Sequence, residues 1–161
     1  MRHRKSTAAK LCFAAGLAVT FAAAPRAAPA QEGGLRFYNS PAMAAAKPPL
    51  SQAVRAGDVL YMSGSIGIVP GTSELAPGGI EGEARQTMEN IGAILKANDL
   101  SFDNVFKCTV MLADMAKWGD FNKVYVTYFK PSRLPSRSAF GVSGLARNAQ
   151  VEVECWAYAG K

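Results

Sequence analysis

Three charged residues near the end of the chain have the types and spacing that chemistry on a small acid would need: Arg137, Glu152 and Glu154. The guanidinium group of an arginine binds a carboxylate through two parallel hydrogen bonds and stays charged at any working pH. A nearby glutamate can move protons to and from a water molecule. Glu152 and Glu154 alternate with apolar residues, so both carboxylates point to one face if this segment is a strand. The pattern predicts a site that holds a substrate carboxylate and activates water.

The pairing of the two C-terminal strands would decide whether these groups meet. Strands are predicted at about 137–142 and 151–158, joined through Ser143-Gly144-Leu145. If they pair with each other about the Gly144-Leu145 midpoint, Arg137 lies directly across from Glu152. The alternative is a cross-strand ion pair with a purely structural role and a small energetic contribution. Spacing alone favours that structural interpretation, because charged groups that perturb each other are often structural.

Other polar residues are weaker candidates. Ser63 interrupts an otherwise apolar strand and Asn122 lies on a predicted helix, and such side chains are more often hydrogen-bonded or solvated than catalytic. The sequence contains no HExxH, EF-hand or GxSxG motif, and Gly64-Ser65-Ile66-Gly67 lacks the spacing of a phosphate loop. The only histidine is His3. We therefore expect neither a metal nor a cofactor, and chemistry from carboxylates, hydroxyls, arginine and backbone groups.

Residues 1–30 have the pattern of a secretory signal peptide. A basic segment from Arg2 to Lys10 precedes an uncharged, Ala-rich run over 11–24, and Ala28-Pro29-Ala30 fits the small-x-small rule for signal peptidase. The run is shorter than the roughly 18 residues of a transmembrane helix. We expect cleavage after Ala30, export to the periplasm or the medium, and no membrane attachment afterwards.

Removal of that segment changes what the charge implies. Five of the 18 Lys and Arg residues, but none of the 12 acidic residues, precede Gln31, so the mature chain carries a net charge of only +1. Nucleic acid is therefore not an expected partner, because RNA and DNA binding depends on a basic surface. Export makes a disulfide between Cys108 and Cys155 chemically possible. Both cysteines lie in apolar, strand-like stretches, however, and two buried free thiols are the favoured interpretation.

The mature chain is predicted to form one α+β domain. Residues 31–47 are loop-like, and the domain is expected over 48–161. Two strands flank Ala56-Gly57-Asp58, a helix with apolar residues at spacings of three and four follows Gly79, and a strand covers 105–112 with Phe106 and Cys108 on one face. A second helix, with aromatic residues at the same spacings, ends at Pro131. The order ββ-α-β-α-ββ puts two helices on one face of a sheet.

The second face of that sheet is predicted to lack a covering layer. We expect it to carry aliphatic and small residues, and an uncovered apolar face usually indicates a partner. A closed homo-oligomer is the simplest way to bury it.

Several segments together resemble the reactive intermediate deaminase family, of the RidA/YjgF type. The most specific part is the combination of Pro135-Ser136-Arg137-Ser138 with Val151-Glu152-Val153-Glu154, and the resemblance covers roughly residues 50–159. The other segments are Ser51-Gln52-Ala53-Val54, Ala56-Gly57-Asp58, Leu60-Tyr61-Met62-Ser63-Gly64, the helix from Gly79 through Asn90-Ile91, and Lys107-Cys108-Thr109-Val110 with Asp114-Met115.

The resemblance implies a chorismate-mutase-like fold, assembled as a homotrimer with three clefts between subunits. Family members hydrolyse reactive 2-imino acids and their enamine tautomers to 2-oxo acids and ammonia without a cofactor. By this resemblance Arg137 binds the substrate carboxylate and Glu152 positions the hydrolytic water. Ser63 would line the cleft, and Asn122 falls at the family's usual asparagine on the second helix.

The sequence departs from the family pattern at two positions. Leu50 stands where the family has a cleft tyrosine, and Ala139 stands where a small thiol residue is common. Both changes make the predicted substrate pocket more apolar and favour a bulkier substrate than 2-iminobutanoate or 2-iminopropanoate. Leu50 also indicates an alternative function, a small-carboxylate-binding module that has lost turnover. Ribonuclease activity, an older label for parts of this family, is disfavoured by the mature charge and by the absence of histidine after His3.

Overall fold

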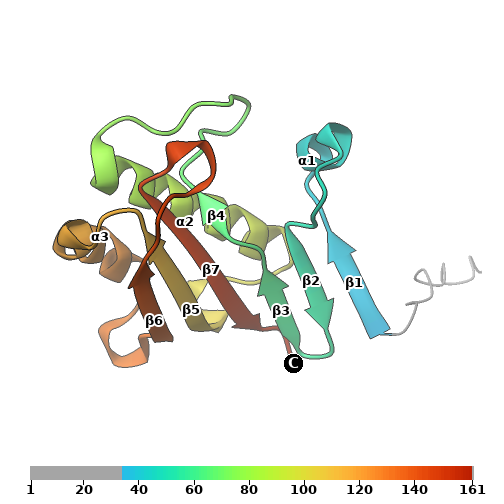
Figure 1. The fold of residues 1–161 in the computed structure, drawn as a ribbon. Helices are drawn as coiled ribbons and strands as arrows, with labels where there is room; N and C mark the ends of the chain where they lie inside the picture. The colour runs from blue at the N-terminus through green and yellow to red at the C-terminus, as the bar shows by residue number, and fades with distance from the viewer. Residues whose placement is uncertain (1–33, 161) are drawn as a thin grey trace, which may run out of the picture. The chain divides into compact units, whose positions relative to one another are not determined.

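Strands and helices follow one another along residues 34–160, the part of the chain that the computed structural model describes (Figure 1). The predicted signal peptide over 1–30 lies outside the described residues. The main elements are β1 (Leu35–Tyr38), α1 (Pro41–Ala46), β2 (Ala53–Ala56), β3 (Val59–Met62), β4 (Ser65–Ile66), α2 (Gly79–Ala97), β5 (Val105–Leu112), α3 (Trp118–Tyr125), β6 (Ser136–Gly141) and β7 (Val151–Tyr158).

All strands belong to one 7-stranded sheet with the order β1-β2-β3-β7-β5-β6, and β4 pairs with β7. The β5–β6 pair is parallel, whereas the other pairs are antiparallel. In Figure 1, α2 runs behind the strands and α3 lies beside it near β5 and β6, which leaves the opposite face of the sheet without a helix. The predicted α+β class with two helices on one face is therefore confirmed. Across residues 34–160, no helix is both long and apolar enough to cross a membrane.

The helix α2 forms where its apolar period predicts it. Ile80, Ala84, Met88, Ile91 and Leu95 are buried against the sheet, as spacings of three and four residues require. Glu83, the fifth residue of α2, is also buried, and its two carboxylate oxygens accept hydrogen bonds from the backbone N and the side-chain Nε2 of Gln150, both at 2.8 Å. This contact ties the start of β7 to α2.

The central strand β7 alternates as predicted. Val151, Val153 and Cys155 are buried on the helix-covered face, and the two intervening glutamates lie on the open face. Cys155 lies directly opposite Cys108 of β5, and the two sulfur atoms form a disulfide. The prediction of two buried free thiols is thus right about burial and wrong about the bond. Sequence spacing did not show that the two cysteines occupy paired positions on neighbouring strands.

Two segments differ from the sequence-based prediction. The stretch expected as a loop over 31–47 contains β1 and α1, because β1 pairs with β2 and so gains a partner that local composition does not reveal. Phe106 was expected to share a face with Cys108, but a β-bulge between Val105 and Lys107 turns it to the open face, where it is 42 % exposed. Val105 occupies the buried position instead.

The open face of the sheet is more aromatic than predicted. Phe37, Val54, Tyr61 and Trp156 are in register across four neighbouring strands, and paired positions point to the same face. Phe37 is 69 % exposed and Tyr61 is 38 % exposed, so this row presents large rings as well as the aliphatic Val54.

Candidate active site

The edge strand β6 directs Arg137 toward the helices. Arg137 pairs with Cys108 of β5, which in turn pairs with Cys155 of β7, and paired residues in a sheet point to one face. Both cysteines are buried beneath α2 and α3. The side chain of Arg137 therefore extends to the helix-covered face, as does Ala139, which packs against the core.

The guanidinium group of Arg137 lies on aromatic rings of α3. Its carbon is 4.5 Å from the centroid of the Trp118 ring, 4.5 Å from that of Tyr125 and 5.9 Å from that of Phe121. These three residues have helical spacing, so one face of α3 presents all three rings. Cation–π contact is made through the flat face of the guanidinium and leaves its N–H edges available. Within residues 34–160, no group accepts a hydrogen bond from the Arg137 guanidinium or forms an ion pair with it.

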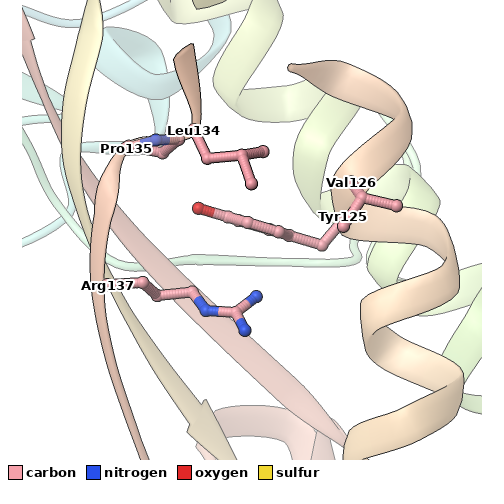
Figure 2. A pocket seen from close by; sticks show the side chains of 5 residues that line it. All are labelled: Tyr125, Val126, Leu134, Pro135 and Arg137. Carbon is pink, nitrogen blue, oxygen red and sulfur yellow. The ribbon is translucent and has the colours of Figure 1, made fainter. Parts of the chain in front are cut away.

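A cavity of about 260 Å³ opens beside this stack (Figure 2). It is lined by Tyr125, Val126, Leu134, Pro135 and Arg137, of which only Arg137 is charged. A cavity with one cationic fork and otherwise largely apolar walls suits a small acid with an apolar remainder. Nothing in the sequence identified Leu134 or Val126 as lining residues, and the aromatic spacing of α3 had indicated only core packing.

Glu152 lies on the other face of the sheet. It pairs with Met111 of β5 and with Ile66 of β4, away from α2 and α3. The strands β6 and β7 do not pair with each other, so the condition that would place Arg137 across from Glu152 is not met. The strand β5 lies between β6 and β7. Beyond the end of β6, the backbone N of Val142 donates to Leu112 O of β5. Beyond the end of β5, the backbone N of Ala113 donates to Gln150 O, just before β7. The structural alternative, a cross-strand ion pair between Arg137 and Glu152, is excluded by the same topology.

The carboxyl group of Glu152 is partly buried on its face of the sheet. A Cβ atom on Gly64 would lie 1.9 Å from Glu152 Oε1, so the carboxylate rests directly against the Gly64 backbone. Burial, and secondarily the negative charge of Glu154, raises the pKa of Glu152 above its usual value. Glu154 is itself engaged, because its Oε1 accepts a hydrogen bond of 2.7 Å from Trp156 Nε1. Glu152 is therefore the carboxyl group better suited to exchange a proton with water.

Ser63 precedes Gly64, the residue that contacts Glu152, and it is bonded to the residue that follows Leu50. The Ser63 hydroxyl donates to Ser51 O at 2.7 Å, and its backbone N donates to Gln52 O at 3.0 Å. The Ser63 side chain therefore holds the segment that follows Leu50, and the hydroxyl proton of Ser63 is used in this hydrogen bond. Leu50 is 49 % exposed. Ser63 is adjacent in sequence to Gly64, which contacts Glu152.

Asn122 lies on α3, near the Arg137 group. It is one helical turn before Tyr125, and its Oδ1 is shielded from solvent with no hydrogen-bond partner in the described part of the chain. The interpretation of Asn122 as a solvated polar residue does not hold for this atom. The predicted site residues thus fall into two groups within one chain. Arg137, Asn122 and Ala139 lie on β6 and α3, whereas Glu152 lies on the opposite face of the sheet, and Ser63 connects its contact Gly64 with the segment after Leu50.

The comparisons with known proteins place this geometry in a family. The model of the family described as endoribonuclease L-PSP matches residues 40–159. The mouse 2-iminobutanoate/2-iminopropanoate deaminase is 47 % identical over 116 residues, which cover 72 % of this chain and 85 % of the relative. The chain belongs to the RidA/YjgF family.

Further RidA/YjgF relatives agree in sequence and in fold. The human 2-iminobutanoate/2-iminopropanoate deaminase is 42 % identical over 112 residues, covering 70 % of this chain and 81 % of the relative. The crystal structure of RidA from an Antarctic Psychrobacter has a TM-score of 0.65 and 36 % identity, covering 69 % of this chain and 89 % of that one. Over residues 34–160 of this RidA/YjgF member, no cluster of His, Cys, Asp and Glu could hold a metal ion.

Proposed function

We propose that this protein hydrolyses reactive 2-imino acids and their enamine tautomers to 2-oxo acids and ammonia. The observation that carries the proposal is the Arg137 fork, whose N–H groups have no protein acceptor in the described residues and line a small, otherwise largely apolar cavity. A carboxylate is the planar, bidentate acceptor that such a fork binds best. The curated relatives named above bear the name of this activity.

The chemistry requires one bound carboxylate and one proton-transfer group. Water adds to the carbon of the C=N bond, and the resulting carbinolamine loses ammonia to leave the C=O bond of the 2-oxo acid. Glu152 is suited to accept a proton from the attacking water and to return it to the departing nitrogen, because its pKa is raised toward neutral pH. No electrons are transferred, so the reaction as written needs no redox cofactor.

A single chain does not bring these two groups to one substrate, because Arg137 and Glu152 extend from opposite faces of its sheet. We therefore propose a homotrimer in which each cleft takes Arg137 from one subunit and Glu152 from its neighbour. Two features support this arrangement: β6 is an edge strand, and the open face carries exposed aromatic rings that a second copy would cover. Light scattering on the chain from Gln31 to Lys161 measures the oligomeric state directly.

Subunit mixing tests the composite cleft. Arg137→Ala and Glu152→Gln proteins are each expected to be nearly inactive in 2-oxo acid release from imines generated in situ. Unfolding and refolding an equal mixture should restore about a quarter of wild-type activity, since about one cleft in four then combines an intact Arg137 with an intact Glu152. A mixture that stays at the level of the single variants would show that both groups act from one chain.

The alternative function, a carboxylate-binding module without turnover, is favoured by Leu50, which brings no phenol to its position. Measurement of 2-oxo acid release by the wild-type protein separates the two. Saturable binding of 2-oxobutanoate with no acceleration of imine hydrolysis would establish the module instead of the enzyme. Ribonuclease activity has less support, because the mature chain carries a net charge of only +1 and contains no histidine.

We also propose that the protein works in the periplasm or outside the cell. The basic and apolar segments before Ala30 support export, and so does the Cys108–Cys155 disulfide, since such bonds persist in oxidising compartments. Mass spectrometry of the protein from its native host should find Gln31 as the first residue. A full-length species beginning at Met1 in the cytosol would contradict the proposal.

A further inference from the structure

Tyr125 is a buried phenol without a hydrogen-bond partner. Its side chain is 3 % exposed, and its hydroxyl oxygen is shielded from solvent with no partner among residues 34–160. A buried hydroxyl that forms no hydrogen bond destabilises the folded protein relative to one that is paired. Unpaired buried polar atoms are uncommon, and one whose side chain lines a cavity has a place where a ligand could pair with it.

The position of this hydroxyl connects it with the proposed carboxylate site. Tyr125 ends α3 and extends across the cavity toward Pro135, just before β6, and toward Arg137 on β6 (Figure 2). In the same view its hydroxyl end lies between Leu134 on one side and the Arg137 guanidinium on the other. The ring centroid is 4.5 Å from the guanidinium carbon, and both side chains line the same cavity, so the phenol and the Arg137 fork lie side by side there.

The phenol is available as a hydrogen-bond donor. Burial raises the pKa of Tyr125 to about 12, although the positive charge of Arg137 partly opposes this shift. The hydroxyl therefore keeps its proton at neutral pH. A carboxylate offers about four lone-pair positions, of which a bidentate arginine uses two, so acceptor positions remain for a further donor.

We propose that the Tyr125 hydroxyl is a second carboxylate-binding group, which donates a hydrogen bond to the substrate carboxylate beside the Arg137 fork. This inference rests on the proposed function and adds a residue to it. With the carboxylate held there, the apolar walls formed by Val126, Leu134 and Pro135 face the remainder of the substrate. The cavity then selects 2-imino acids with an apolar side chain over those with a charged one.

Tyr125→Phe tests the donor, because it removes only the hydroxyl and keeps the ring beneath Arg137. The carboxylate does not change during imine hydrolysis, so its contacts act equally on the ground state and the transition state. We expect KM to rise about tenfold with kcat within about twofold, as is typical for loss of a hydrogen bond to a charged group. The Kd of the product analogue 2-oxobutanoate, measured by calorimetry, should also rise about tenfold.

The melting temperature of Tyr125→Phe distinguishes a ligand-binding hydroxyl from a structural one. Loss of a structural hydrogen bond would lower it, whereas loss of an unpaired hydroxyl should raise it. Removal of an unpaired buried hydroxyl should raise the melting temperature of the ligand-free protein by about 2–5 °C. Tyr128→Phe is the matched control, because the Tyr128 hydroxyl is outside the cavity and donates to Arg85 O at 3.2 Å. The control should leave KM and the Kd of 2-oxobutanoate unchanged.

The inference is overturned if Tyr125→Phe binds 2-oxobutanoate as the wild type does, or if Tyr128→Phe weakens binding equally. A lower melting temperature with unchanged affinity would also overturn it, by showing that the phenol is paired inside the assembled protein. Failure of the proposed function has a different signature: the wild type would bind 2-oxobutanoate, and Tyr125→Phe would weaken that binding, yet neither would accelerate imine hydrolysis.

Discussion

Replacement of Arg137 by alanine removes both the carboxylate fork and the cation that lies on the α3 rings. If each charge-assisted hydrogen bond contributes about 1.5 kcal/mol at the lower end of its usual range, loss of the pair weakens transition-state binding by about 3 kcal/mol. That corresponds to a fall in kcat/KM of about 150-fold or more. Contact with the Trp118 and Tyr125 rings, each 4.5 Å away, adds a smaller stability effect of about 1–2 kcal/mol.

The conservative variant separates charge from geometry. Arg137→Lys keeps a cation near the rings but cannot reproduce a planar fork, so it should recover only a small part of the lost kcat/KM. The assay is 2-oxo acid release from an imine generated in situ, alongside a melting curve for each variant. Arg133→Ala is the matched control, because this exposed arginine donates to Asp103 O at 3.2 Å and does not line the cavity. An Arg137→Ala protein that folds and hydrolyses imines at the wild-type rate would refute the proposed role of the fork.

Three further variants test Glu152 and the sheet around it. Glu152→Gln should lower kcat while the Kd of 2-oxobutanoate stays within about twofold, since proton transfer is lost and the fork is intact. The same variant should raise the melting temperature at neutral pH. Folding raises the pKa of Glu152, so the ionised carboxylate destabilises the native state, and glutamine removes that cost. The gain should vanish as the pH falls below the ordinary pKa of 4.5, and an equal gain at all pH values would contradict the assignment. Gly64→Ala should displace the carboxylate, since the new Cβ would lie 1.9 Å from Oε1, and kcat should fall with little change in that Kd; wild-type kcat would argue against a requirement for this placement. The Cys108→Ala/Cys155→Ala protein should lose up to about 4 kcal/mol of unfolding free energy in urea, as expected for a crosslink that spans 47 residues, and an unchanged midpoint would show that the disulfide contributes no net stability.

Local patterns determined much of what was predicted correctly. The spacing of Ile80, Ala84 and Met88 was sufficient for α2, since a helix buries one face whatever it packs against. The alternation from Val151 to Tyr158 defined β7 to the residue, because side chains on a strand point to alternate faces in any sheet. The family motifs around Arg137 and Glu152 likewise indicated the right family before any coordinates.

Which residues face one another was decided only by the tertiary structure. Strand pairing joins segments that are remote in sequence, so nothing local showed that β5 separates β6 from β7 or that Cys108 lies opposite Cys155. A one-residue bulge is enough to reverse the face of Phe106. The environment of Tyr125 likewise depends on three elements meeting: α3, the segment before β6, and β6 itself. The spacing of apolar residues shows which side of a helix or strand is buried. Which residues pack against that side depends on the long-range pairing of the strands in the sheet.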